Sequence, residues 1–175
     1  MDLFNLGKKK SPWILHYNAG SCNGCDIEIL ATLSPKYDVE RFGIINKGNP
    51  KQGDILVVTG PVTKRSRERI VQIYTQIPEP KVVVSVGACA NCGGVFRGMY
   101  NQEDGVDRYI PVDVYVAGCA SRPEQIIEGI AKALDILEQK TDEIEKPKKL
   151  FGKISNTFNQ KNCRDIAKGV DAKNS

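Results

Sequence analysis

Apolar segments alternate with amphipathic ones along most of this chain, and this alternation constrains the fold more than any other feature. Continuous apolar runs at 55–58 and 82–86 predict strands that are covered on both faces, as in a parallel sheet. Further strands are expected at 12–17, 38–44 and 112–118. Amphipathic patterns predict helices at 25–33, 64–77 and 122–139. Together they predict a doubly wound α/β domain, with a mostly parallel sheet and helices on both faces.

Two of these helices are predicted from the spacing of particular side chains. Ile27, Leu30 and Leu33 recur at helical spacing in the first. In the second, the apolar residues on one side are Ile70, Ile73 and Ile77. A glycine-rich loop is expected from about Ala88 to Arg108.

Length and charge divide the chain into three parts. Its 175 residues suffice for one domain that buries about 70% of the unfolded surface. We expect an N-terminal arm at 1–10, an α/β domain at 11–139 and a charged extension at 140–175, either a disordered tail or a segment that folds onto a neighbouring subunit. The net charge of +4 arises entirely in the extension. The basic stripe that nucleic-acid binding requires is therefore missing.

The cysteine content and the absence of a leader indicate the compartment. The opening residues, MDLFNLGKKKSPW, contain neither a cleavable apolar segment nor twin arginines. The apolar runs are far shorter than the roughly 20 residues that a membrane helix needs. Six cysteines in such a chain indicate a reducing cytoplasm, where thiols serve metals or chemistry. We expect a protein on the cytoplasmic side that does not itself span the membrane.

Cysteines follow three of the predicted strands. Cys22 and Cys25 follow the first strand, Cys89 follows the run at 82–86, and Cys119 follows the strand at 112–118. Because parallel strands present their carboxyl ends at one edge of a sheet, we expect these four thiols at the same edge. Ligands of doubly wound sheets bind at that edge.

A Cys-x-x-Cys pair at the start of a helix has three ordinary uses: a redox dithiol, half a zinc site, or half an iron–sulfur site. A redox dithiol leaves Cys89 and Cys119 without a role. Zinc is satisfied by Cys22 and Cys25 together with Cys89 and Cys92, as a structural clip in an interaction module. A [4Fe–4S] cluster also takes four thiolates and adds electron transfer, which the fold cannot supply by itself.

Glycines crowd around these cysteines and favour the cluster. They allow the backbone to approach a bulky group and to direct N–H donors at its sulfurs. The glycines in question are Gly20, Gly24, Gly87, Gly93, Gly94 and Gly118. Cys92 is left out of the ligand set because Cys89 already supplies a ligand from that loop, and Cys163 is expected to be a free thiol.

Four motifs together resemble a known family. They are SPWILHYNAGSCNGCDIEIL (11–30), DILVVTGPVT (54–63), VGACANCGG (86–94) and GCASRPEQII (118–127). In this order they look like the small, electron-transferring subunit of the energy-converting, membrane-bound [NiFe] hydrogenases, which is homologous to the proximal-cluster subunit of respiratory complex I. In the quinone-reducing relatives the first two ligands are adjacent, whereas Asn23 and Gly24 separate them here. Ala120 stands where the family often has proline.

The resemblance implies a flavodoxin-like domain that holds one [4Fe–4S] cluster through Cys22, Cys25, Cys89 and Cys119. The partners it implies are a [NiFe] large subunit that holds the Ni–Fe centre, a ferredoxin-like two-cluster subunit, and membrane subunits that keep the protein peripheral on the cytoplasmic side. The expected function is electron transfer between the ferredoxin-like subunit and the Ni–Fe site, for production or oxidation of H2. The equivalent subunit of a quinone- or sulfur-reducing complex is the alternative.

Two titratable residues lie near the first cysteine pair in the sequence. Glu28 follows Cys25 by one helical turn, and is either a proton relay beside a redox centre or a solvated helix carboxylate. His16 has no second imidazole to pair with and is expected to be a hydrogen-bonded core or interface histidine.

Overall fold

A computed structural model describes residues 11–151, with side chains up to residue 143. Its sheet has five strands: β1 (Trp13–Asn18), β2 (Ile45–Asn46), β3 (Ile55–Thr59), β4 (Val82–Val86) and β5 (Val114–Val116). The strands are all parallel and lie in the order β2-β1-β3-β4-β5. This is the flavodoxin-like order, in which the direction of winding reverses between β1 and β3. The predicted fold class is confirmed.

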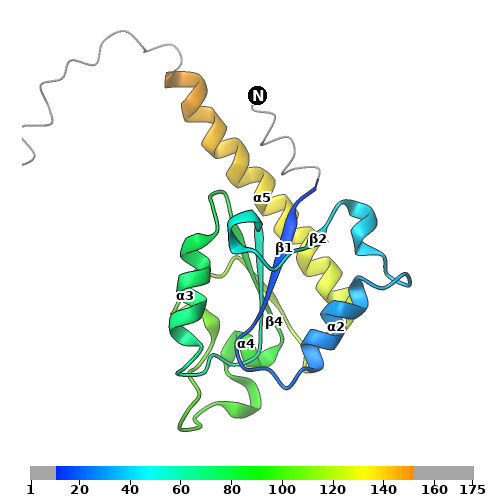
Figure 1. Cartoon of the computed structure of the whole chain (residues 1–175), viewed down its shortest axis with the longest axis vertical. Helices are drawn as coiled ribbons and strands as arrows, with labels where there is room; N and C mark the ends of the chain where they lie inside the picture. The colour runs from blue at the N-terminus through cyan, green and yellow to red at the C-terminus, as the bar shows by residue number, and fades with distance from the viewer. Residues whose placement is uncertain (1–10, 152–175) are drawn as a thin grey trace, which may run out of the picture. The chain divides into compact units, whose positions relative to one another are not determined.

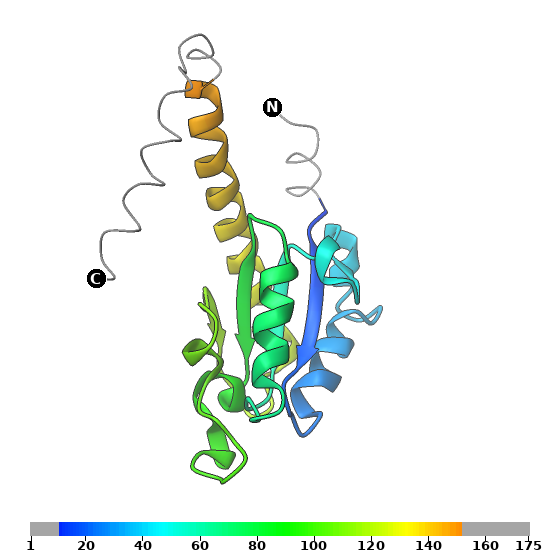
Figure 2. The ribbon, with the colours of Figure 1, turned by 60° about the vertical axis from the view of Figure 1, so that its left-hand side comes forward.

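Helices cover both faces of the sheet. They are α2 (Gly24–Thr32), α3 (Arg67–Gln76), α4 (Ala88–Cys92) and α5 (Pro123–Phe151). Side chains alternate along β3, so that Ile55 and Val57 pack toward α2 and α5 whereas Leu56 and Val58 pack toward α3 and α4. Figure 1 and Figure 2 show α3 on one side of the sheet and α5 on the other. The strands are thus apolar on both faces, as the sequence predicts.

The strand predicted at 38–44 is wrong. The chain forms the short 3-10 helix η1 (Val39–Phe42) there, and only Ile45–Asn46 pairs with β1. Asp38 and Gly43, at the two ends of η1, adopt left-handed backbone conformations with φ of 46° and 83°. These conformations turn the chain and are incompatible with an extended strand. The alternation of apolar residues reflects a turn that buries Val39, not a strand.

Helix α2 is present, but two of the residues whose spacing predicts it do not face the core. Ile27 is 64% exposed and Leu30 is 57% exposed, whereas Asp26, Ile29 and Thr32 are buried. The reason lies at the start of the helix, where polar partners on β1 and β3 hold the Asp26 side chain inward. That anchor fixes the rotation of α2 about its axis and leaves Ile27 and Leu30 on the outer face.

The structure divides into two units with a boundary between Asp142 and Glu143. Helix α5 continues to Phe151, past the position at which the sequence predicts the end of the α/β domain. The division at 139 stays a prediction, and the arm at 1–10, the extension beyond 151 and Cys163 lie outside the described residues. None of the helices within 11–151 has the length and apolar character needed to cross a membrane.

Candidate metal centre

Three loops at the carboxyl ends of the strands carry the four cysteines predicted as ligands. Cys22 lies between β1 and α2, and Cys25 lies in the first turn of α2. Cys89 lies in α4, directly after β4, and Cys119 follows β5. Because all the strands are parallel, the three loops share one edge of the sheet. Cys22 and Cys119 are exposed, whereas Cys25 and Cys89 are half-buried.

The three loops are in direct contact. The Ala88 amide, in the loop after β4, donates to the Gly118 carbonyl, in the loop after β5, at 2.8 Å. A Cβ placed on Gly24 would lie 3.4 Å from Ala120 Cβ, so the start of α2 also touches the loop after β5. These contacts join the segments that carry all four thiols into one continuous surface.

Two glycines leave room for thiols. A Cβ placed on Gly87 would lie 2.6 Å from Cys25 Sγ, and one placed on Gly94 would lie 2.9 Å from Cys89 Sγ. Both glycines also have positive φ, which side chains rarely adopt. Not every glycine near a cysteine has this role, since a Cβ on Gly20 or Gly93 would meet Thr63 or Arg97 instead.

Two of the four thiols, Cys25 and Cys89, have raised pKa values. Burial raises the pKa of Cys25, and the negative charges of Cys22 and Cys119 raise it further, against a hydrogen bond from the Ser121 backbone. Burial likewise raises the pKa of Cys89, with contributions in the same direction from Cys119, Cys22 and Cys25. Thiolates that repel one another in this way are stabilised by a cationic metal group, which deprotonates the thiols it binds.

Cys92, the extra thiol, has a different environment. It occupies the last position of α4, is exposed, and its thiol lies 3.3 Å from the Ala88 carbonyl, to which it donates. Within residues 11–151, no group of three or more His, Cys, Asp and Glu side chains is close enough to hold a metal ion. The choice of Cys119 over Cys92 as fourth ligand stays a prediction.

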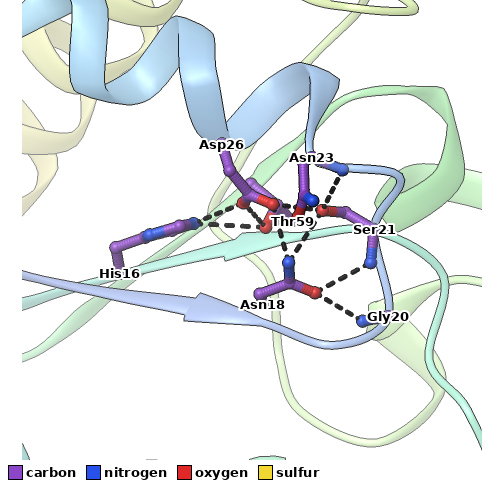
Figure 3. Close-up of polar contacts among 7 residues, drawn as sticks. All are labelled: His16, Asn18, Gly20, Ser21, Asn23, Asp26 and Thr59. Atoms are coloured by element: carbon purple, nitrogen blue, oxygen red, sulfur yellow. Dashed lines mark hydrogen bonds and ion pairs between the residues drawn. The ribbon is translucent and has the colours of Figure 1, made fainter.

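A polar network that the sequence analysis missed surrounds Asp26, the residue after Cys25 (Figure 3). The buried Asp26 carboxylate accepts hydrogen bonds from Asn18 at 2.6 Å, from Thr59 and from Ser21. His16 Nε2 lies 2.8 Å from Asp26 Oδ1. Burial alone raises the pKa of Asp26, but the hydrogen bonds from Ser21 and Thr59 and the His16 ring outweigh burial and lower it.

The network fixes the loop that carries Cys22. Asn18 Oδ1 accepts from the Gly20 and Ser21 amides at 2.8 Å each, and Ser21 Oγ accepts from the Asn23 amide (Figure 3). His16 is half-buried and partnered, as predicted. Asp26 was missed because a carboxylate in the first turn of a helix is ordinarily solvated. The available signal was its helical spacing with Ile29, three residues on, which places both on one face.

Glu28 lies half-exposed on α2, one turn after Cys25 and between the exposed Ile27 and Leu30. More apolar side chains are exposed in the loop after α4, where Val95 is 79% and Tyr100 is 91% exposed. Exposed apolar groups beside a functional edge are typical of a surface that contacts another protein. The basic side chains from Lys64 to Arg69 are exposed as well.

The chain is similar in sequence to several known proteins. Residues 22–133 match the family model described as "NADH ubiquinone oxidoreductase, 20 Kd subunit". A probable membrane-bound hydrogenase subunit, mbhJ, of Pyrococcus furiosus is 53% identical over 128 residues, covering 73% of this chain and 77% of that protein. Formate hydrogenlyase subunit 7 of Escherichia coli is 46% identical over 132 residues, which are 75% of this chain and 52% of that protein.

Chains in solved structures also superpose on this one. A chain of the membrane-bound sulfane sulfur reductase, an archaeal respiratory membrane complex, superposes with a TM-score of 0.68 at 42% identity, covering 78% of this chain and 76% of the other. A chain of an NAD+-reducing [NiFe]-hydrogenase superposes with a TM-score of 0.56 at 17% identity, over 71% and 91% of the two chains, which supports the fold alone. The resemblance drawn from the motifs is confirmed, and the chain belongs to the family of the 20 kDa subunit of NADH ubiquinone oxidoreductase.

Proposed function

We propose that this chain is the electron-transfer subunit of an energy-converting [NiFe] hydrogenase and holds one [4Fe–4S] cluster through Cys22, Cys25, Cys89 and Cys119. The observation that carries the proposal is the contact among three loops that bring these cysteines to one edge of the sheet. The raised pKa values of Cys25 and Cys89, to which neighbouring thiols contribute after burial, support the same grouping. When bound, a cluster of this kind supplies reversible one-electron transfer.

The chain's own groups would hold the cluster in place. The Asp26 network fixes the loop that carries Cys22, and the lack of a side chain at Gly87 leaves space for Cys25 Sγ. Backbone amides add donors: those of Ser121 and Val95 donate to the thiols of Cys25 and Cys89, which opposes the rise in pKa that burial causes. Such donors stabilise negative charge on sulfur and so favour a reduced cluster.

The surface and the relatives support a set of partners. Cys22 and Cys119 are exposed at the same edge as Ile27, Leu30 and the apolar loop after α4, which supports a buried interface there in the assembled complex. We assign that interface to a large subunit with a Ni–Fe centre. A ferredoxin-like subunit would exchange electrons with this chain, and membrane subunits would hold the complex at the cytoplasmic side of the membrane.

Glu28 is proposed as a proton relay at that interface. It is placed one helical turn from Cys25, and its neighbours Ile27 and Leu30 would be covered when a partner binds. A carboxylate at such an interface can accept a proton from a reacting group of the partner or donate one to it.

A sulfur-reducing complex is the second candidate. The 42% identity to a chain of the sulfane sulfur reductase supports it directly. The two candidates share the cluster and differ in the partner subunit and in the electron acceptor. Their common rival is a zinc-stabilised module that uses Cys22, Cys25, Cys89 and Cys92.

One purification separates these functions. The chain is tagged in its own host, and the complex is isolated without oxygen and analysed for iron, sulfide, nickel and zinc. The proposal predicts iron and sulfide with broad visible absorption, nickel in the complex, and H2 formation from reduced ferredoxin. Iron without nickel, with reduction of sulfur or quinone, would replace the hydrogenase with the second candidate. Zinc without iron would reject an electron-transfer role.

A further inference from the structure

Ser121 is an unusual residue among the buried hydroxyls of this protein. Five buried residues within the described side chains carry a hydroxyl: Thr32, Thr59, Ser85, Ser121 and Thr141. Four of them donate to an acceptor, such as Ser85 to Asn91 Oδ1 at 2.7 Å and Thr141 to the Leu137 carbonyl at 2.7 Å. Ser121 Oγ has no partner within the described part of the chain, although the residue is 0% exposed.

A buried hydroxyl without a partner is unfavourable. Leaving such a group unsatisfied costs about 1–3 kcal/mol, and most buried polar groups are hydrogen-bonded for that reason. An alanine at this position would fill nearly the same space without that cost. The hydroxyl therefore indicates an acceptor that is bound at this position.

The surroundings of Ser121 point to the thiol site. Its backbone N–H donates to Cys25 Sγ, so the residue lies against one proposed ligand. It lies two residues after Cys119, which is another. Its Oγ lies 3.0 Å from the position that a Cβ on Gly118 would occupy, and the Gly118 carbonyl binds the start of α4. The hydroxyl is thus enclosed where the three cysteine-bearing loops meet.

We infer that the Ser121 hydroxyl donates a hydrogen bond to a sulfur of the bound cluster, either thiolate or sulfide, and thereby sets its reduction potential. This inference rests on the proposed function, because the acceptor belongs to the cluster. A hydroxyl is free to rotate about its C–O bond and can donate to a sulfur while its oxygen stays in place. Reduction adds negative charge to the sulfurs, so a donor at this position favours the reduced form and raises the potential.

The test is a redox titration of the intact complex, followed by electron paramagnetic resonance. Ser121→Ala removes the donor and should lower the equilibrium constant for one-electron reduction by up to about tenfold, equivalent to about 59 mV. Ser121→Thr keeps the hydroxyl and should stay within about threefold of the parent. Thr141→Val removes a buried hydroxyl that bonds to a helix carbonyl, and should leave the potential unchanged.

The outcomes are distinguishable from failure of the proposed function. A parent complex in which this chain lacks iron would reject the proposed function. A parent with its cluster, and Ser121→Ala with the parent's potential, would reject only the role of Ser121. If Ser121→Ala fails to assemble a cluster, Ser121→Thr decides: a normal cluster and potential support the inference, and loss of the cluster there also overturns it.

Discussion

The two edges of the sheet are built from the same five strands but satisfy their polar groups differently. At the amino ends, the Asp54 carboxylate accepts from the Trp13 amide at 3.0 Å and Asp113 accepts from the Val83 amide at 2.9 Å. Asp113 also pairs with Lys140 at 2.7 Å. The buried Lys81 ammonium donates to the Tyr74 carbonyl at 2.9 Å. Each of these polar groups has a partner within the fold.

At the carboxyl ends, not every buried polar group has a partner within the described residues. The Asp26 network is fully partnered, but it ends at the loop that carries Cys22. Beyond it lie Cys25 and Cys89, whose pKa values are raised by burial and by neighbouring thiols, and the Ser121 hydroxyl, which has no partner within the described residues. The polar groups named at the amino ends are satisfied within the fold, and the carboxyl ends are where the proposed cluster would bind. Substitutions at the two edges should therefore have separable effects.

The largest effect is expected from Gly87→Ala. The new Cβ would lie 2.6 Å from Cys25 Sγ, at a backbone φ of +90° that disfavours side chains. Displacement of the thiol should remove most of the iron from this chain, measured by metal analysis and visible absorption. Gly98→Ala is the matched control, since Gly98 has a φ of +81° but nothing within 4 Å. The Gly98→Ala variant carries about 1–2 kcal/mol of backbone strain from the positive φ and should keep its iron. Equal iron in both variants would contradict the proposed contact.

A smaller effect, on turnover alone, is expected from Glu28→Gln. The amide keeps the size of the side chain but does not titrate, so a relay through Glu28 should lose about 100-fold in H2 formation, the scale of general acid–base catalysis. The cluster signal should persist. Glu68→Gln, on an exposed position of α3, should leave the rate within about twofold. A Glu28→Gln rate that is also within about twofold would show that Glu28 is an ordinary helix residue.

The smallest effect should come from the opposite edge. Lys140→Met removes the ammonium that pairs with Asp113 and donates to the Lys81 carbonyl at 3.1 Å. Because Lys140 is partly exposed, the loss in free energy of unfolding should be about 1 kcal/mol, measured by urea denaturation of the full chain. Lys132→Met removes an exposed pair with Glu128 and should lose about 0.5 kcal/mol or less. Loss of iron in Lys140→Met would contradict the separation of the two edges.

The sequence was sufficient to predict the sheet and the edge at which the cysteines gather. The strands at 55–59 and 82–86 are apolar on both faces, and parallel pairing then brings the residues after each strand together. Periodicity failed at 38–44, because apolar alternation does not distinguish a strand from a turn that buries Val39. Periodicity also predicted the wrong buried face of α2, because the buried Asp26 carboxylate sets the rotation of that helix about its axis.

The roles of Asp26 and Ser121 depend on contacts between distant segments. Asp26 accepts a hydrogen bond from Thr59, 33 residues away, and the Ser121 backbone donates to Cys25 at the start of α2. The spacing of Asp26 with Ile29 places both on one face of α2, but the partner in each of these contacts cannot be read from the local sequence. By contrast, the edge at which Cys22, Cys25, Cys89 and Cys119 lie follows from topology, since each lies between the end of a strand and the first turn of the next helix.

The central claim is that Cys119, and not Cys92, completes a four-thiolate iron–sulfur site with Cys22, Cys25 and Cys89. The direct test compares Cys119→Ala with Cys92→Ala in the purified complex, by iron and sulfide content and by the paramagnetic signal of the reduced cluster. The signal should be abolished in Cys119→Ala and retained in Cys92→Ala, because the exposed Cys92 thiol donates to the Ala88 carbonyl of its own helix. A cluster that survives loss of Cys119 but not of Cys92 would contradict the account.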